Sequence, residues 1–136
     1  MKTRTTPSIL IALLLAFLAL GATKAQAIII HDLPVGITFG QTARVTAANT
    51  GTTSIIINYT FLDGEGAVLA QFARQVIEPG KMMSFDLNAD DIVRENNRIQ
   101  IRVVISGDTS RGLLTSIEVF ENDTGKTTVF IGDPGL

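Results

Sequence analysis

Alternating oxygen ligands in one acidic stretch are the first candidate for chemistry in this chain. Asp86, Asn88 and Asp90 place a side-chain oxygen at every second position, as the first half of a calcium-binding loop does. An EF-hand loop also needs glycine at its sixth position and glutamate at its twelfth. Counted from Asp86, these positions hold Asp91 and Asn97. The mismatches favour a strand end that leads into a capped helical turn, with calcium as the alternative.

Acidic residues in the segment Asp63-Gly64-Glu65-Gly66 are the second candidate, because Asp63 and Glu65 could offer carboxylates to a cation. Turn chemistry alone explains the aspartate and both glycines. Aspartate hydrogen-bonds its own backbone, and glycine accepts a positive φ. We therefore interpret the segment as a turn and keep a calcium or carbohydrate site in the acidic loops as the alternative.

Side chains on which most enzymes depend are scarce. The chain has no cysteine, which excludes a thiol nucleophile, a thiolate zinc site and a redox motif. His31 is the only histidine, and no G-x-S-x-G elbow presents a serine. Nothing in the order of the acidic residues selects a pair for acid–base catalysis. The sequence predicts a protein with no catalytic activity and no cofactor other than the calcium alternative.

Three arginines, Arg94, Arg98 and Arg102, recur at every fourth residue. The last two fall on a predicted strand and point to the same face, where they could form a basic outer patch with Arg44. Ordinary surface charge paired with nearby carboxylates explains the pattern equally simply. A patch that binds an acidic glycan or a peptide carboxylate is the alternative.

The first 27 residues have the features of a secretory signal peptide. Lys2 and Arg4 give a basic start, and residues 9–20 are uniformly apolar but shorter than the roughly 20 residues of a membrane-spanning helix. Ala25-Gln26-Ala27 supplies the small residues of a cleavage site, so we expect cleavage after Ala27. A retained N-terminal anchor is the alternative. We predict a secreted or periplasmic protein without a stable membrane anchor after cleavage.

Residues 28–136 would then form one domain of 109 residues. Because the leader removes Lys2, Arg4 and Lys24, the net charge falls from −2 to −5. This charge argues against nucleic acid and anionic membranes as partners, since both attract basic patches. Without cysteine the domain has no disulfide and must be held together by its core.

Seven or eight short strands are predicted in this domain. Residues 54–87 contain three strand-like runs, which we interpret as a meander with turns at Asp-Gly-Glu-Gly and Glu-Pro-Gly-Lys. Residues 98–106 alternate most clearly between apolar and polar side chains. Breaks at intervals of roughly 8–12 residues are typical of an antiparallel sandwich or barrel.

Local departures from this pattern have their own predictions. Pro34 is expected to turn the chain out of an edge strand at residues 28–30. Arg74 interrupts an apolar face, which a β-bulge would resolve. Residues 88–97 are predicted to form about two helical turns, with Asn88 as the cap.

A family resemblance follows from residues 45–51, the hairpin at residues 61–70 and the Pro79-Gly80 turn. This layout resembles the immunoglobulin-like and fibronectin-type-III-like sandwiches of bacterial exported proteins. It is similar to small exported proteins made of a signal peptide and one such domain. The resemblance implies an all-β, immunoglobulin-like antiparallel sandwich, but no particular activity. The cysteine pair and the tryptophan of true immunoglobulin domains are absent.

From these features we predict an exported structural or protein-interaction module with a protein partner. A sheet edge can accept a partner's strand through main-chain hydrogen bonds. The terminal strands, residues 28–30 with Ile29 and residues 127–131 with Val129, are the candidate edges. The alternative function is an extracytoplasmic calcium- or carbohydrate-binding domain.

The cleavage site can be tested directly. N-terminal sequencing of the exported protein is expected to begin at Ile28. Ala27→Lys is expected to leave the leader attached, because the peptidase needs a small residue there, whereas Gln26→Ala is expected to be processed normally. A full-length chain retained in the membrane fraction would instead support the anchor.

Overall fold

The computed structural model describes residues 28–94, 97–109 and 111–132, and for residues 28–32 it describes the backbone alone. The predicted signal peptide lies outside these residues. No helix among them is long and apolar enough to span a membrane. The described chain forms one 3₁₀ turn, η1 (Ala89–Asp91), and eight strands: β1 (Ile28–Thr38), β2 (Gln41–Asn49), β3 (Ile55–Asp63), β4 (Val68–Ile77), β5 (Met82–Asn88), β6 (Arg98–Gly107), β7 (Leu113–Glu121) and β8 (Thr127–Gly132).

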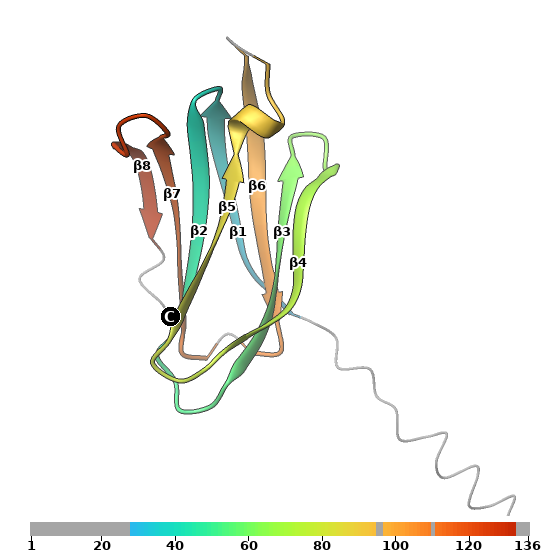
Figure 1. The fold of residues 1–136 in the computed structure, drawn as a ribbon. Helices are drawn as coiled ribbons and strands as arrows, with labels where there is room; N and C mark the ends of the chain where they lie inside the picture. Colours follow the sequence, from blue (N-terminus) through green and yellow to red (C-terminus); the bar gives the residue numbers. More distant parts are fainter. Residues whose placement is uncertain (1–27, 95–96, 110, 133–136) are drawn as a thin grey trace, which may run out of the picture.

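The strands form two antiparallel sheets of four (Figure 1), which confirms the all-β prediction and is compatible with a sandwich. The order is β1-β6-β3-β4 in the first sheet and β5-β2-β7-β8 in the second. Only β3–β4 and β7–β8 are consecutive strands that pair with each other. Every other connection carries the chain from one sheet to the other, so the two layers are joined repeatedly along the sequence.

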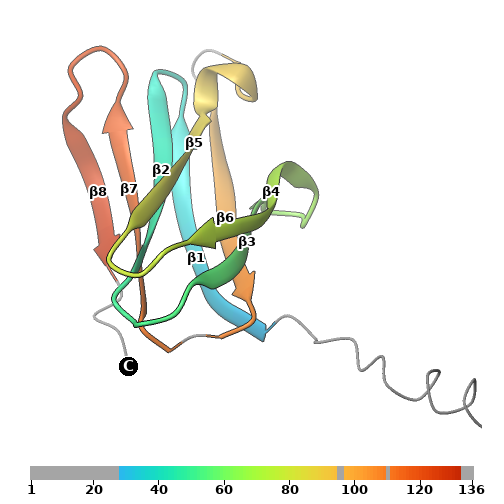
Figure 2. The same cartoon turned by 60° about the horizontal axis from the view of Figure 1, so that its bottom comes forward.

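The predicted meander is wrong in its last strand. β5 pairs with β2 and not with β4, because the turn after β4 carries the chain across to the second sheet. Figure 2 shows this crossing at the end of the molecule that comes forward. The turn is docked on the end of β2 through the N–H of Gly80, which donates to the Asn49 carbonyl at 2.8 Å.

Two predicted boundaries are also wrong. β1 does not turn away after residue 30 but continues through Pro34 to Thr38. It pairs only with β6, and an edge strand tolerates a proline, so the edge position itself is confirmed. Of the predicted helix at residues 88–97, residues 95–96 lie outside the described residues. Within residues 88–94 it is reduced to η1, because Ile92 has a non-helical φ of −127° and ends it. Asn88 caps this turn as predicted.

The predicted bulge in β4 is confirmed. Arg74 has a φ of 52°, and its N–H donates to the Asn58 side-chain oxygen at 2.9 Å. The register of β4 against β3 shifts at this point. Phe72 therefore packs against the core before the bulge and Ile77 is buried after it, while Val76 is turned outward.

Side chains along each strand point alternately to its two faces, and the inward set, rich in β-branched and aromatic residues, lies between the sheets. On one side of the sandwich, Phe85 of β5 packs against Tyr59 and Phe72 of the first sheet, with ring centroids 4.6 and 4.4 Å apart. These rings and the β4–β5 turn close that side. We call this the closed side of the sandwich. The opposite side, which we call the open side, is bounded by the edge strands β1 and β8. The fully buried large side chains are Ile37, Val45, Ile55, Ile57, Tyr59, Phe61, Ile77, Ile101, Val103, Ile105, Ile117 and Val119.

One buried polar side chain joins three segments at the end of β2. The Asn49 amide nitrogen donates to the carbonyls of Thr53 and Ile77, both at 2.8 Å. Its side-chain oxygen accepts the N–H of Gly51 at 2.9 Å. Asn49 is only 1% exposed and its bond to the Ile77 carbonyl is buried, so water cannot replace that bond.

Asn49→Ala is expected to lower the free energy of unfolding by about 2–4 kcal/mol, because it leaves the buried Ile77 carbonyl without a donor and also removes the bonds to Thr53 and Gly51. Urea unfolding measures the change. Thr52→Ala, an exposed neighbour in the same loop, is the matched control and is expected to stay within about 0.5 kcal/mol of the wild type. Equal stability of the two variants would contradict this role of Asn49.

Candidate functional site

Asp86, the first residue of the predicted calcium set, forms an ion pair across the second sheet. The guanidinium of Arg44 donates to both carboxylate oxygens at 2.8 Å, which is the bidentate geometry. This hydrogen-bonded contact and the charge of Asp86 raise the pKa of Arg44 above its ordinary value. The same guanidinium lies 5.0 Å from the ring centroid of Phe120. Arg44 thus faces outward on the second sheet, and it does not join Arg98 and Arg102 of β6 in a patch.

The other two residues of that set belong to a hydrogen-bond network that ties three connections together. Asp90 accepts the N–H of Gly40 at 2.5 Å and an N–H of the Asn122 side chain at 3.0 Å. Asn88 accepts from the same side-chain nitrogen at 3.1 Å. The Thr42 hydroxyl donates to the Asn122 side-chain oxygen at 2.6 Å. The network joins the β1–β2 turn, η1 and the β7–β8 turn.

These contacts divide the three predicted calcium ligands between an ion pair and a loop network. A calcium ion would have to compete with Arg44 for Asp86 and with two N–H groups for Asp90. No group of three acidic or histidine side chains suited to a metal occurs among the residues the structure describes. Calcium binding stays a prediction.

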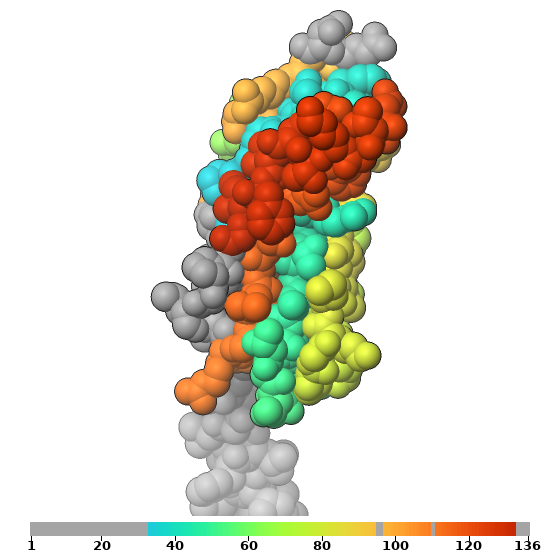
Figure 3. Space-filling model, turned by 90° about the vertical axis from the view of Figure 1, so that its left-hand side faces the viewer, coloured from blue at the N-terminus to red at the C-terminus, as the bar shows by residue number. Residues whose placement is uncertain are grey.

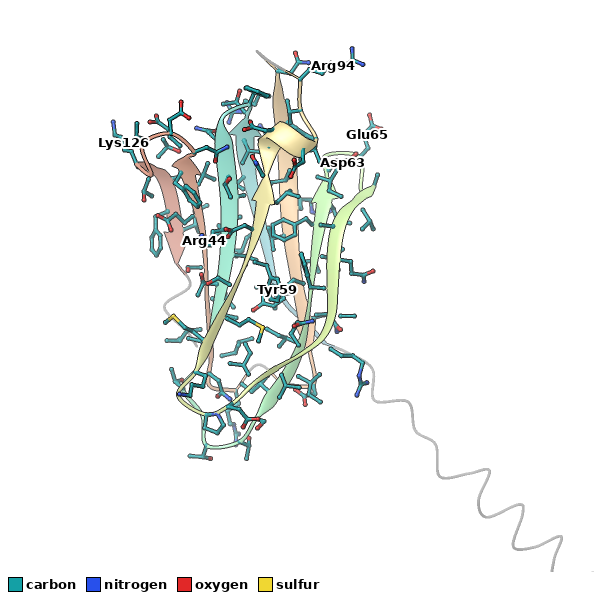
Figure 4. All side chains as sticks on the ribbon, viewed as in Figure 1. Arg44, Tyr59, Asp63, Glu65, Arg94 and Lys126 are labelled. Carbon is teal, nitrogen blue, oxygen red and sulfur yellow. The ribbon has the colours of Figure 1, made fainter. Side chains whose placement is uncertain are left out.

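The Asp63 segment is a turn, as predicted. One oxygen of the Asp63 carboxylate accepts the N–H groups of Glu65 at 2.9 Å and of Ala67 at 2.8 Å. Figure 4 shows Asp63 and Glu65 together at the tip of the β3–β4 turn, away from Lys126 on the β7–β8 turn. The carboxylate of Asp63 is therefore used to shape the turn.

The predicted edge strands flank a groove of about 260 Å³ on the open side of the sandwich. Val129 of β8 is one of its lining residues, whereas Ile29 pairs with Ser106 at the far end of β1. The structure thus brings one of the two predicted edge residues to the groove. Its lining also includes Gly36, Ile37, Thr38, Gln41, Arg98 and Thr128.

Within this groove, Arg98 lies across the backbone of Gly36. A Cβ at Gly36 would come within 2.3 Å of Nη2 of Arg98, so only glycine permits this approach. Sequence reasoning singled out Arg98 but missed Gly36. The available signal was a glycine inside a strand, which can mark the close approach of another group.

A second hollow, of about 240 Å³, lies on the outer face of the second sheet. Figure 3 shows this face, with β5 in yellow, β2 in green, β7 in orange and β8 in red. Met82 and Phe130 border the hollow and are 70% and 66% exposed, respectively. The hydroxyl-bearing residues Thr46 and Ser116 also line it. The hollow therefore combines apolar surface with polar groups.

Tyr59 is a buried ionisable residue in the core. Figure 4 shows it between the sheets, and its side chain is 0% exposed. Its hydroxyl has no hydrogen-bond partner within the described structure. Burial raises the pKa of Tyr59 above its ordinary value, because the phenolate would lose its hydration. The residue fills the core, as its position in the alternating pattern predicts.

Comparisons of the chain with protein-family models, with curated proteins and with solved structures find no match. The chemistry available to the protein follows from the geometry above: the two sheet edges β1 and β8 beside the groove, the guanidinium in that groove, and the hollow with both apolar and polar lining.

The state of Tyr59 can be read alone, because it is the only tyrosine. As pH passes about 10, phenolate absorption is not expected to rise while circular dichroism stays native. The native state holds the proton more tightly than the unfolded state, so stability is unchanged below that pH and falls above it. Tyr59→Phe removes no hydrogen bond, and it is expected to keep or gain stability and to lose this alkaline decline. Phenolate absorption that rises near pH 10 in a folded protein would contradict the assignment.

Proposed function

We propose that the protein is an exported, non-catalytic structural or interaction module that binds an extended segment of a partner protein. The observation that carries the proposal is the asymmetry of the sandwich. One side is closed by Phe72, Phe85 and the β4–β5 turn. The other leaves a groove between β1 and β8. The basic start, the short apolar run and the Ala25-Gln26-Ala27 site support a periplasmic or secreted location.

Strand addition is the binding mode that suits such a groove, because the main chain of an edge strand supplies hydrogen bonds and neighbouring side chains supply selectivity. At the end of β1, the N–H of Thr38 donates to the Gln41 side-chain oxygen at 3.1 Å. This N–H therefore points away from β6. Peptide groups of alternate residues in an antiparallel strand point the same way, so those of Gly36 also face outward.

An immunoglobulin-like topology is part of the proposal. The pairing of two pairs of strands supports it. β2 beside β5 and β3 beside β6 correspond to the B–E and C–F pairs of immunoglobulin domains. The outer strands differ. β1 pairs with β6, where such domains have their last strand, and β7 pairs with β2, where they have their first. This exchange places the N-terminal strand beside the groove.

Carbohydrate binding is the second candidate, and the hollow beside Phe130 favours it. An exposed ring with the hydroxyls of Thr46 and Ser116 near it offers the mixture of apolar contact and placed polar groups that small-ligand sites use. The hollow lies on the face of a single sheet, whereas the groove lies between the edges of two sheets. We therefore rank the groove first as the binding site.

Site-specific photo-crosslinking in the source organism tests the interaction site. A benzophenone side chain in place of Thr128, an exposed residue of β8 that lines the groove, is expected to give a higher-mass adduct with a protein partner. The same replacement of Val76, an exposed apolar residue on β4 at the closed side, is the matched control and is expected to give none. Adducts only from Val76, or equally from both positions, would contradict binding at the open side.

A further inference from the structure

Among the residues that the structure describes, Arg98 is the only ionisable side chain that lines the groove between β1 and β8. Its guanidinium makes no hydrogen bond or ion pair with any residue that the structure describes. The remaining lining is neutral and includes the hydroxyls of Thr38 and Thr128 and the amide of Gln41. Within the described part of the chain, the groove therefore has one unpaired guanidinium and an otherwise neutral lining, which gives it a local positive character in a protein whose exported form has a net charge of −5.

The guanidinium lies against the backbone of β1. A Cβ at Gly36 would lie 2.3 Å from Nη2, 2.6 Å from Nε and 2.8 Å from Cζ of Arg98. The planar group therefore rests on a strand position that has no side chain. A guanidinium has five N–H donors in a fixed plane, which suits the two oxygens of a carboxylate.

Main-chain groups and the guanidinium meet at the same place. The peptide group of Gly36 faces away from β6, as argued from the Thr38 hydrogen bond. Many of the remaining polar groups nearby are occupied. The hydroxyl of Thr38 donates to the Asn97 carbonyl at 2.8 Å, and that of Thr128 donates to the Val119 carbonyl at 3.1 Å. The free donors in the groove are therefore concentrated at Gly36, at Arg98 and on the Gln41 amide nitrogen.

We infer that the groove binds an extended peptide segment that carries an aspartate or glutamate opposite Arg98. The main chain of the segment pairs with the edge of β1 at Gly36, and the acidic side chain receives two hydrogen bonds from the guanidinium. Direct contact, and not long-range attraction, selects the acidic residue, because the domain as a whole is acidic. This inference rests on the proposed interaction function and names the chemistry of the partner.

The test uses the purified exported protein and two pools of pentapeptides with acetylated and amidated ends. The central residue is glutamate in one pool and glutamine in the other, and the flanking residues are randomised. The glutamate pool is expected to be retained about tenfold more strongly, as for a charge-assisted pair. Arg98→Gln is expected to equalise the pools, whereas Arg98→Lys is expected to keep part of the preference, because it keeps the charge without the bidentate geometry.

Two further variants separate position from charge. Gly36→Ala leaves the charge unchanged but displaces the guanidinium, so it is expected to weaken the preference for glutamate. Arg111→Gln removes an exposed arginine from the β6–β7 connection and is expected to leave the preference intact. Thermal unfolding of each variant shows that it is folded.

The outcomes separate the inference from the proposed function. A glutamate preference that survives Arg98→Gln overturns the role of Arg98. Equal retention of both pools by the wild type overturns the acidic specificity but leaves strand addition in place. Retention of neither pool, together with no adduct from Thr128, overturns both.

Discussion

The buried amide of Asn49 is the contact on which the rest of the architecture depends. It ties the end of β2 to the following loop and to the end of β4, while the backbone of Asn49 holds the turn that leads to β5. The chain crosses between sheets at this point, so β5 is laid beside β2 and directly across from β4. That placement lets the ring of Phe85 close one side of the sandwich. Because β4 and β5 occupy the closed side, β1 and β8 are left at the open one.

Local features of the fold were predictable because their causes are local. Alternation identified the buried face of β6, and the misplaced Arg74 indicated the bulge that reverses the faces of β4. Strand neighbours were not predictable in this way. A period of two shows which face of a strand is buried, but not which strand lies beside it. The β4–β5 turn has the residues of a hairpin turn, yet it joins different sheets, since docking on Asn49 decides the outcome.

For the candidate-site residues too, the local pattern was predictable from the sequence, whereas the contacts between distant segments were not. Asp86 and Asp90 are two of a regular series of oxygen ligands, but the partners that engage them, Arg44 and Asn122, are distant in the sequence. Arg98 was recognisable as a charge on the outer face of a strand. That it lies over Gly36 depends on the pairing of β1 with β6, which brings together two strands that are far apart in the sequence. Sequence patterns identify donors and acceptors, whereas pairing decides which of them remain free.

An open sheet edge carries a risk of indefinite strand addition, and the residues around the groove limit it. Pro34 has the same orientation in β1 as Gly36, so the proline, which has no N–H, faces outward at the point where pairing would extend. At the other end, the N–H of Thr38 is already occupied by Gln41. Where β1 borders the groove, the accessible main chain is thereby confined to the neighbourhood of Gly36. A short stretch of main chain gives little affinity by itself, so a side-chain contact must supply the selectivity. The guanidinium of Arg98, which lies over that same glycine, is the group in position to provide it.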